Sequence, residues 1–483
     1  MKRIAVYALV ALTQAASASQ PDSQTQESRG QQPPSDSELR QIISERIAGF
    51  ENRVSITVGV IGPQGRRIVS YGSEGTNSSR SATGDTIYEV GSITKVFTSL
   101  LLADMVEHGE VALDDPVAKY LPHDVSVPMR SGKQITLADL ATHRSALPRM
   151  PANFIAADPM NPYVDYPVQR LYQFLSSYQL QHDVDSAFEY SNLGAGLLGH
   201  ALARRAGTNY ETLLRRRVLE PLKMSSTGIV LDPALKSRQS QPHSSVFLLA
   251  STPPWDFTDA FAGAGAIRSS AGDMLTFLAA TIGYTRTPLS AAMARMVAVR
   301  REATSTFKMG LGWRVEQLDG TEVVWTGGAT YGSRAFAAYD PKSRVGVVVL
   351  SNYNSGSGID DIGRHVLNAR IPLDNGVGVR PRTRTASRVP AGLLDAYACR
   401  YRFSNNQIWS VRRDGNRYFV KKPGEAEFEI FPEGDFEKGS DDFFSDSMDA
   451  LFTFDFEKSS SSRANQLTFS WAFLDPQHAK RID

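Results

Sequence analysis

Apolar residues concentrate in two pairs of short segments near the two ends of the central part of the chain. "VSITVGVIG" (54–62) and "RRIVSYG" (66–72) lie on either side of a Gly-Pro turn, and "SRAFAAYD" (333–340) and "RVGVVVLSN" (344–352) lie on either side of an Asp-Pro turn. Each pair predicts an antiparallel hairpin. Because helical spacings fill much of the interval, the pattern predicts one sheet built from both ends of this segment, with helices packed on it.

Two helices are predicted within that interval. After Ser92, apolar residues recur at positions 93, 96, 97, 100, 101 and 105, which predicts a helix with one buried face. After Asn192, they recur at 193, 197, 198, 201 and 202, and Gly207 marks the predicted end. Thr208 and Glu211 have the spacing of a capping box for the next helix.

The pattern changes after residues 371–390, a stretch rich in Pro, Gly and Arg that predicts a linker. Beyond it, aromatic residues alternate with polar ones, as in "QIWSVRRDGNRYFVKK" and "QLTFSWAF". This alternation is typical of short antiparallel strands, with a turn at Asp414-Gly415. Residues 391–483 are therefore predicted to form a small β domain.

The N-terminus has the pattern of a secretory signal peptide at residues 1–18. Lys2 and Arg3 precede a short apolar run, and small residues at 16–18 form a cleavage signal. A surface or core helix is the competing interpretation. Residues 19–36 are polar, rich in Pro, Gln and Ser, and predict a disordered linker. We therefore expect a secreted or periplasmic protein with no membrane span in the mature chain.

Composition narrows the function classes. The 483 residues carry a net charge of +1, which implies no broad attraction to nucleic acid or anionic membranes. The single cysteine, Cys399, excludes an internal disulfide and cysteine-rich metal sites, and is best explained as a small buried hydrophobe. The histidines lack a metal-ligand spacing, and no phosphate-binding loop or dinucleotide fingerprint is present. No cofactor is expected.

Ser92 and Lys95 carry the first candidate chemistry. Three residues apart, they can share one face of the predicted helix. At the first helical turn, the backbone N–H of Ser92 can point at an oxyanion formed on a carbonyl that Ser92 attacks. Burial and the helix dipole disfavour the Lys95 ammonium, so that this residue can help to remove the serine proton. The alternative is a chance motif with an N-terminal capping serine.

Two further segments offer partners for this pair. Tyr190 precedes a helix, and between cationic groups its phenolate can serve as a general base. Asn192 offers an amide to Lys95 or to a substrate carbonyl. "VVWTGGATYGSRAF" (323–336) predicts a Gly-rich edge strand that can pair with a substrate and supply a second oxyanion N–H. Taken singly, each has a structural explanation: a core tyrosine, a capping asparagine and a Gly-rich turn.

The order Ser-x-x-Lys, Tyr-x-Asn and Thr-Gly-Gly resembles the serine β-lactamase and penicillin-binding superfamily. The Tyr-x-Asn version resembles the class C β-lactamase group, which includes D-alanyl-D-alanine carboxypeptidases and esterases. The resemblance covers residues 40–370, and the segment from 391 resembles a small β domain of some relatives. It implies an α+β fold for residues 37–370, with an antiparallel sheet flanked by helices and an all-helical subdomain.

The resemblance also implies site residues. Ser92, Lys95 and Tyr190 match the catalytic positions. The predicted substrate-binding residues are Asn192, Thr326, Gly327 and Gly328.

Two departures from the family pattern concern positive charge. Relatives usually carry Lys or His at the start of the third motif, where an ungapped match places Thr326 and a shifted match places Trp325. Relatives also carry Thr-Ser-Gly-Leu-Pro where this chain has "THRSALP" (142–148). Arg144 of that run is a candidate to replace the missing cation, which would otherwise help to bind a substrate carboxylate.

The leading hypothesis is a secreted, monomeric serine hydrolase that cleaves a β-lactam amide through a Ser92 acyl-enzyme. A D-Ala-D-Ala-like peptide or an ester is the alternative substrate, and the missing cation slightly favours the ester. A non-catalytic peptidoglycan-binding homologue is the competing class. The four residues Ser92, Lys95, Tyr190 and Asn192 argue against that class, and the altered third motif argues for it.

Overall fold

The computed structural model describes most of the chain from residue 32 onward. Within 32–483 it leaves out residues 77, 159, 245–249, 355–357, 375–385, 404–406, 424–426, 434–435, 437–439, 446–449, 457–462 and 472–476. The predicted signal peptide (1–18), most of the predicted disordered linker (19–36) and the centre of the second linker (371–390) lie outside the described residues.

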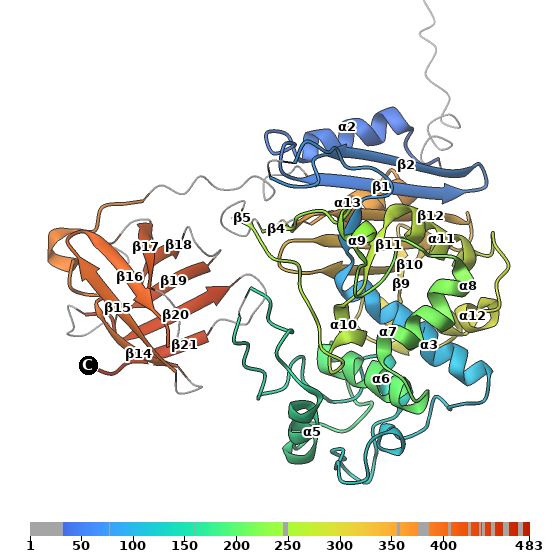
Figure 1. Cartoon of the computed structure of the whole chain (residues 1–483), viewed down its shortest axis with the longest axis horizontal. Helices are drawn as coiled ribbons and strands as arrows, with labels where there is room; N and C mark the ends of the chain where they lie inside the picture. The colour runs from blue at the N-terminus through green and yellow to red at the C-terminus, as the bar shows by residue number, and fades with distance from the viewer. Residues whose placement is uncertain are drawn as a thin grey trace, which may run out of the picture.

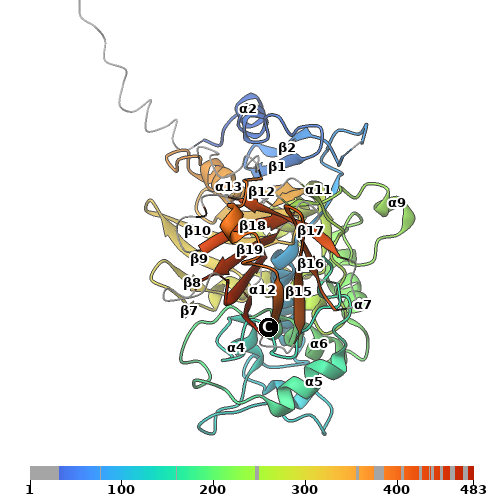
Figure 2. The ribbon, with the colours of Figure 1, turned by 90° about the vertical axis from the view of Figure 1, so that its left-hand side faces the viewer.

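The described residues form a large α+β domain and a smaller all-β domain, which lie side by side in Figure 1 and overlap in Figure 2. The large domain is built on an antiparallel sheet with strand order β2-β1-β12-β11-β10-β9-β8-β7. Its strands are β1 (Ser55–Gly62), β2 (Gly65–Gly72), β7 (Arg301–Glu302), β8 (Phe307–Met309), β9 (Arg314–Leu318), β10 (Thr321–Ala329), β11 (Arg334–Asp340) and β12 (Val345–Ser351). Short strands outside it are β3 (Ile87–Glu89), β4 (His243–Ser244), β5 (Ala250–Ser251), β6 (Arg268–Ser270) and β13 (Tyr353–Asn354).

The sheet joins both ends of the domain, as the hydrophobic pattern predicts. The two predicted hairpins are present, with Gly62 opposite Gly65 in one and Asp340 opposite Val345 in the other. Strand β1 then pairs antiparallel with β12, so that Ile56 lies opposite Ser351. Nearly all residues of β1 and β12 are buried because helices cover both faces of the sheet.

Helices pack on the two faces of the sheet. The apolar side chains of α2 and α13 share a core with one face of the sheet, and those of α3 and α6 belong to the core on the other face. The helices are α2 (Asp36–Arg46), α3 (Thr94–Glu107), α4 (Leu137–Ala141), α5 (Val168–Ser177), α6 (Asn192–Arg205), α7 (Tyr210–Leu214), α8 (Glu220–Leu222), α9 (Pro233–Lys236), α10 (Ala262–Gly265), α11 (Ala271–Ile282), α12 (Ser290–Ala298) and α13 (Asp360–Leu367).

The helix that follows Ser92 differs from its prediction in one respect. Apolar spacing predicts one buried face, but every residue of α3 from Thr94 to Met105 is buried. The helix lies inside the core, and its polar side chains are satisfied there. Thr98, for example, donates to the carbonyl oxygens of Thr94 and Gly263. Local hydrogen bonding therefore lets a polar face be buried without a large penalty.

The helix predicted after Asn192 is also present, but the helix that follows it has a different N-terminal cap from the one predicted. Helix α6 begins at Asn192, and Ser191 caps it through a hydrogen bond from the Gly194 N–H. The capping box predicted at Thr208 and Glu211 is wrong. The cap of α7 is Asn209, whose side chain accepts from the Thr212 N–H.

The smaller domain is a closed antiparallel barrel, β14 to β21. Its strands are β14 (Cys399–Phe403), β15 (Ile408–Asp414), β16 (Arg417–Lys421), β17 (Phe428–Glu433), β18 (Ser440–Ser445), β19 (Ala450–Asp455), β20 (Gln466–Trp471) and β21 (Gln477–Arg481). The predicted turn at Asp414-Gly415 joins β15 to β16. Inward-facing aromatic side chains fill the barrel, and Tyr331 of the large domain belongs to the same apolar cluster.

Three other features bear on the function classes. Cys399 is buried and has no disulfide partner. In the part of the chain that the structure describes, no helix combines the length and hydrophobicity needed to cross a bilayer. Across the same residues, no group of three or more His, Cys, Asp or Glu side chains is arranged to hold a metal ion.

Candidate active site

A tight turn presents Ser92 between a strand and the buried helix. Strand β3 ends at Glu89, a 3-10 turn spans Gly91–Ile93, and α3 begins at Thr94. Gly91 has a φ of 51°, and a Cβ added there would lie 2.7 Å from the backbone nitrogen of Ala329. Only glycine allows this backbone angle and this close approach without strain. The turn is therefore held against the end of β10.

The side chains of Ser92, Lys95 and Tyr190 meet at one point. Lys95 Nζ donates to Ser92 Oγ at 3.0 Å and to the carbonyl oxygen of Ala264 at 2.7 Å. The Tyr190 hydroxyl donates to Ser92 Oγ at 2.7 Å. The nucleophile candidate thus lies within proton-transfer distance of two candidate bases.

Burial and neighbouring charge shift both bases toward their deprotonated forms. The pKa of the Lys95 ammonium is lowered, chiefly because burial disfavours its charge. Burial alone raises the pKa of Tyr190, but the charge and hydrogen bond of Lys95, the Ser92 hydrogen bond and Arg314 together lower the pKa below its ordinary value. The two groups titrate as a coupled pair.

Cations and a neutral histidine surround the Tyr190 ring. Its centroid lies 5.0 Å from Lys95 Nζ, 5.3 Å from the guanidinium carbon of Arg149 and 5.9 Å from that of Arg314. The His143 ring packs at 4.6 Å, and its Nδ1 accepts a hydrogen bond from the Ser191 N–H. Burial and these three cations hold the pKa of His143 well below its ordinary value, so the ring is neutral.

Asn192 lines the cavity, but its side chain is oriented by Tyr163 and not by Lys95, the neighbour expected from the sequence. Its Nδ2 donates to the Tyr163 hydroxyl at 3.2 Å. Its Oδ1 is buried and has no hydrogen-bond partner among the described residues. No hydrogen bond joins it to Lys95 in the described part of the structure. The amide is therefore positioned next to the site with unsatisfied hydrogen-bonding capacity.

The third motif, Thr-Gly-Gly with Trp325 before it, lies in strand β10, where successive side chains point to opposite faces. Trp325, Gly327, Gly328 and Ala329 line the cavity, whereas Thr326 is buried, 3% exposed, and does not line it. A Cβ at Gly328 would collide with the Val90 carbonyl oxygen. The alternation of side chains along a strand thus turns Trp325, and not Thr326, toward the cavity. Of the two possible matches to the family motif, the shifted one, which places Trp325 where relatives carry Lys or His, gives the residue that faces the site.

Glu89 ties the nucleophile turn to two walls of the cavity. One oxygen of this buried carboxylate accepts the Trp255 N–H at 2.7 Å, and the other accepts the hydroxyls of Thr330 at 2.9 Å and Ser333 at 3.2 Å. Thr330 and Ser333 lie on either side of Tyr331 in the chain. Tyr331 and Trp255 both line the cavity. Glu89 is not among the site residues predicted from the sequence, because only the folded chain brings its hydrogen-bond partners together.

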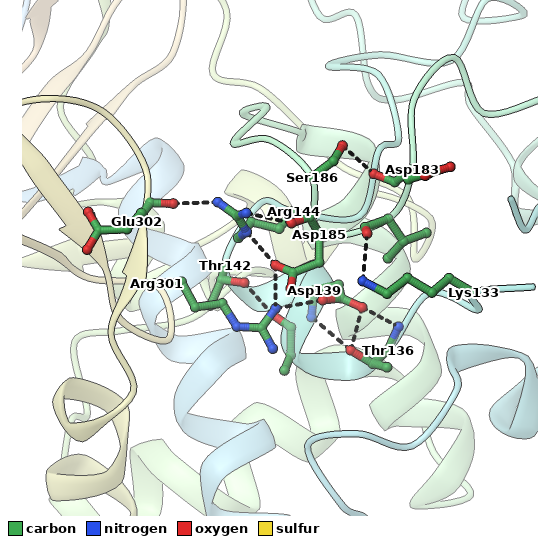
Figure 3. Close-up of polar contacts among 12 residues, drawn as sticks. Lys133, Thr136, Asp139, Thr142, Arg144, Asp183, Asp185, Ser186, Arg301 and Glu302 are labelled. Carbon is green, nitrogen blue, oxygen red and sulfur yellow. Dashed lines mark hydrogen bonds and ion pairs between the residues drawn. The ribbon is translucent and has the colours of Figure 1, made fainter. Parts of the chain in front are cut away.

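Arg144, the candidate for the missing cation, does not reach the cavity. Figure 3 shows its guanidinium bound to the Asp185 carboxylate and to backbone oxygens of Asp185 and Glu302, each at 2.5 Å. Arg301 joins the same network through Asp139 at 2.6 Å and Asp185 at 3.3 Å. Arg144 is thus engaged in an ion-pair network and does not line the cavity around Ser92.

The site opens into a cavity of about 550 Å³. Its wall is mainly aromatic, and its charged side chains are Arg149, Arg314, Arg334 and Asp360. The aromatic lining consists of Phe154, Tyr163, Phe188, Tyr190, Trp255, Phe257, Phe307, Trp325 and Tyr331. A concave, apolar pocket with a few converging polar groups is typical of a small-molecule site.

Comparisons with known proteins point to one family. The sequence profile of the Beta-lactamase family matches residues 39–369. The D-alanyl-D-alanine-carboxypeptidase/endopeptidase AmpH of Escherichia coli is 28% identical over 314 residues, covering 61% of this chain and 80% of that protein. A β-lactamase of Psychrobacter immobilis is 26% identical over 337 residues, covering 61% of this chain and 78% of that protein.

Solved structures show the same fold. A class C β-lactamase from Rhodobacter sphaeroides superposes with a TM-score of 0.56 at 25% identity, covering 65% of this chain and 94% of that one. An octameric penicillin-binding protein homologue from Pyrococcus abyssi superposes with a TM-score of 0.60 at 20% identity, covering 92% of this chain and 99% of that one. The second match extends into the C-terminal domain.

Proposed function

This chain belongs to the β-lactamase family and is a serine hydrolase, and we propose that it cleaves a β-lactam amide through an acyl-enzyme on Ser92. The observation that carries the proposal is the convergence of Lys95 Nζ and the Tyr190 hydroxyl on Ser92 Oγ, at 3.0 and 2.7 Å. A serine hydroxyl is a weak nucleophile until a neighbouring base takes its proton.

The proposed reaction has two stages. In the first, the Tyr190–Lys95 pair takes the Ser92 proton, Oγ bonds to the carbonyl carbon, and the pair returns the proton to the leaving nitrogen as the C–N bond breaks. In the second, the same pair takes a proton from water, whose oxygen bonds to the acyl carbon, and the pair returns that proton to Ser92 Oγ as the ester C–O bond breaks. The backbone N–H of Ser92 and one from the end of β10 are proposed to hold the oxyanion in both stages.

A D-alanyl-D-alanine peptide is the second candidate substrate. It is favoured by the similarity to a D-alanyl-D-alanine-carboxypeptidase/endopeptidase over 61% of this chain. The same acyl-enzyme chemistry serves both substrates. Non-catalytic binding is disfavoured, because binding alone would not require two buried bases on one serine oxygen. The proposed export to the periplasm or medium rests on the N-terminal sequence alone.

Covalent labelling tests the proposal. Wild-type protein is incubated with a fluorescent penicillin, and the modified peptide is identified by mass spectrometry, in parallel with assays of penicillin hydrolysis and of D-alanine release from an acyl-D-Ala-D-Ala peptide. We expect an adduct on Ser92 that is absent in Ser92→Ala, a variant that should fold normally. Labelling at another residue, or near-native turnover by Ser92→Ala, would overturn the mechanism.

A further inference from the structure

Aromatic rings hold the Arg314 side chain at the edge of the cavity. Arg314 lies at the start of β9, directly opposite Trp325 on β10. Its guanidinium carbon is 4.7 Å from the centroid of the Trp325 ring, 5.6 Å from that of Phe307 and 5.9 Å from that of Tyr190. Cation–π contacts of this kind orient a guanidinium but leave its N–H donors in the ring plane available.

No acidic side chain forms an ion pair with Arg314 among the described residues, although Asp360 attracts its charge from across the cavity. Asp360, the carboxylate that lines the same cavity, receives two hydrogen bonds from Arg334, at 3.2 and 3.1 Å. Arg364, which lies 4.6 Å from the Trp325 ring, is paired with Glu316 at 3.0 Å. Arg314 itself forms no hydrogen bond or ion pair with any side chain in the described part of the structure.

A second unpaired guanidinium lies beside it. Arg149 is exposed, lines the cavity and lies over the Tyr190 ring. Within the described chain its guanidinium, like that of Arg314, has no ion-pair partner. Arg314 is partly buried, and partial burial of a charge is costly unless a counter-charge is supplied, which an anionic ligand would do. Burial also lowers the pKa of Arg314, which reflects the same cost.

We propose that Arg314, assisted by Arg149, binds a carboxylate of the substrate on the leaving-group side of the scissile bond. This rests on the proposed function of Ser92. Both guanidiniums lie over the ring of Tyr190, whose hydroxyl contacts Ser92 Oγ. In the proposed reaction this hydroxyl delivers the proton to the leaving nitrogen. A carboxylate held there belongs to the departing amine. The preferred substrate class is therefore an acyl compound whose leaving group carries an anionic carboxylate.

The third motif by itself offers a substrate carboxylate no cation. With Trp325 in place of a Lys or His, weak discrimination between an acidic substrate and its neutral analogue is expected. The ladder pairing of β9 with β10 instead brings a cation from the neighbouring strand onto the face of that tryptophan. The positive charge thus comes from Arg314 on β9 and not from the motif on β10. We therefore expect strong discrimination between an acidic substrate and its neutral analogue.

A pair of ester substrates tests the proposal without relying on β-lactam turnover. One is a phenylacetylglycine ester of 3-hydroxybenzoic acid, and the other is the same ester with that carboxylate blocked as its methyl ester. We expect wild type to prefer the acidic ester about tenfold or more in kcat/KM, the size of one charge-assisted hydrogen bond. Arg314→Gln should remove most of this preference, and Arg314→Lys should keep part of it.

The ratio of kcat/KM for the two esters is measured on one preparation of each variant. It therefore does not depend on the fraction of that variant's molecules that fold correctly. Arg149→Gln should lower the preference less, because that side chain is exposed and screened by solvent. Arg286→Gln, at an exposed position away from the cavity, is the matched control. Equal losses on both esters in Arg314→Gln would overturn the proposal and leave Arg314 acting only through Tyr190. If neither ester acylates Ser92 while the fluorescent penicillin does, the proposed leaving-group preference is overturned. If none of the three acylates Ser92, the proposed function fails instead.

Discussion

The Tyr190 hydroxyl lies 2.7 Å from Ser92 Oγ although 98 residues separate the two in the chain. Each stands at the entrance of a buried helix, Tyr190 before α6 and Ser92 before α3. Packing of the two helices fixes the distance, while Lys95, one turn along α3, reaches the same oxygen. The three side chains form one proton-transfer unit, and their substitutions should therefore not act independently.

Tyr190→Phe and Lys95→Ala should each lower kcat about a hundredfold or more, because both remove a participant in proton transfer. The double variant should lose little more than the worse single variant, since both residues serve one step. Steady-state kinetics of the four proteins in the cycle give the answer. If the two losses multiply fully, the residues act separately and their assigned roles are wrong.

The pH dependence follows from the lowered pKa values of Lys95 and Tyr190. The deprotonated pair is the active base, so kcat/KM should rise with pH, with a midpoint below the ordinary pKa of either side chain. Removing a nearby cation should make deprotonation harder. Arg314→Gln should therefore move this midpoint to higher pH.

This shift is measured with the neutral ester, so that carboxylate binding does not contribute. Arg286→Gln serves as the control and should leave the midpoint in place. A midpoint that moves to lower pH in Arg314→Gln, or does not move, would contradict the assignment of Tyr190 and Lys95 as the titrating pair.

Gly328→Ala should nearly abolish activity. The added Cβ would collide with the Val90 carbonyl oxygen and lie 2.9 Å from the backbone nitrogen of Ser92, forcing β10 away from the nucleophile turn. Displacing an oxyanion donor costs about a hundredfold or more in kcat. Gly272→Ala is the matched control, because its Cβ would meet its nearest neighbours only at 3.7 Å. Near-native kcat in Gly328→Ala would show that this contact does not position the site.

Deleting residues 391–483 should leave a folded domain that still labels at Ser92. The barrel has its own aromatic core, and the catalytic side chains come from α3 and the entrance of α6. Turnover should fall, because Trp255 and Tyr331 pack against the barrel's core. Circular dichroism and fluorescent-penicillin labelling are the measurements. A truncated protein that aggregates or stays unlabelled would mean that the two domains share one core.

The sequence predicts those features that depend on local spacing. Ser92 and Lys95 share a helical turn, and the two hairpins follow from apolar segments beside their turns. The meeting of Tyr190 with Ser92 follows only from family resemblance, because no local rule joins positions so far apart. The full burial of α3 escapes periodicity analysis, since Thr98 is polar in sequence yet satisfied in the core.

Arg314 illustrates why the rest of the site could not be predicted. It belongs to no motif, and its importance depends on the register that places β9 beside β10, with Arg314 opposite Trp325. Arg144 lies in a recognisable motif but is held by Asp185. Likewise, alternating aromatic residues predict strands in the C-terminal region, but closure of the barrel depends on the pairing of β14 with β21.

Tyr331 belongs to the apolar cluster of the barrel and also lines the catalytic cavity. Substrate binding and docking of the barrel therefore depend on the same side chain. By thermodynamic linkage, a ligand that binds more tightly when the barrel is docked must strengthen that docking by the same factor. Any substitution at Tyr331 therefore acts on the cavity wall and on the contact between the domains at once.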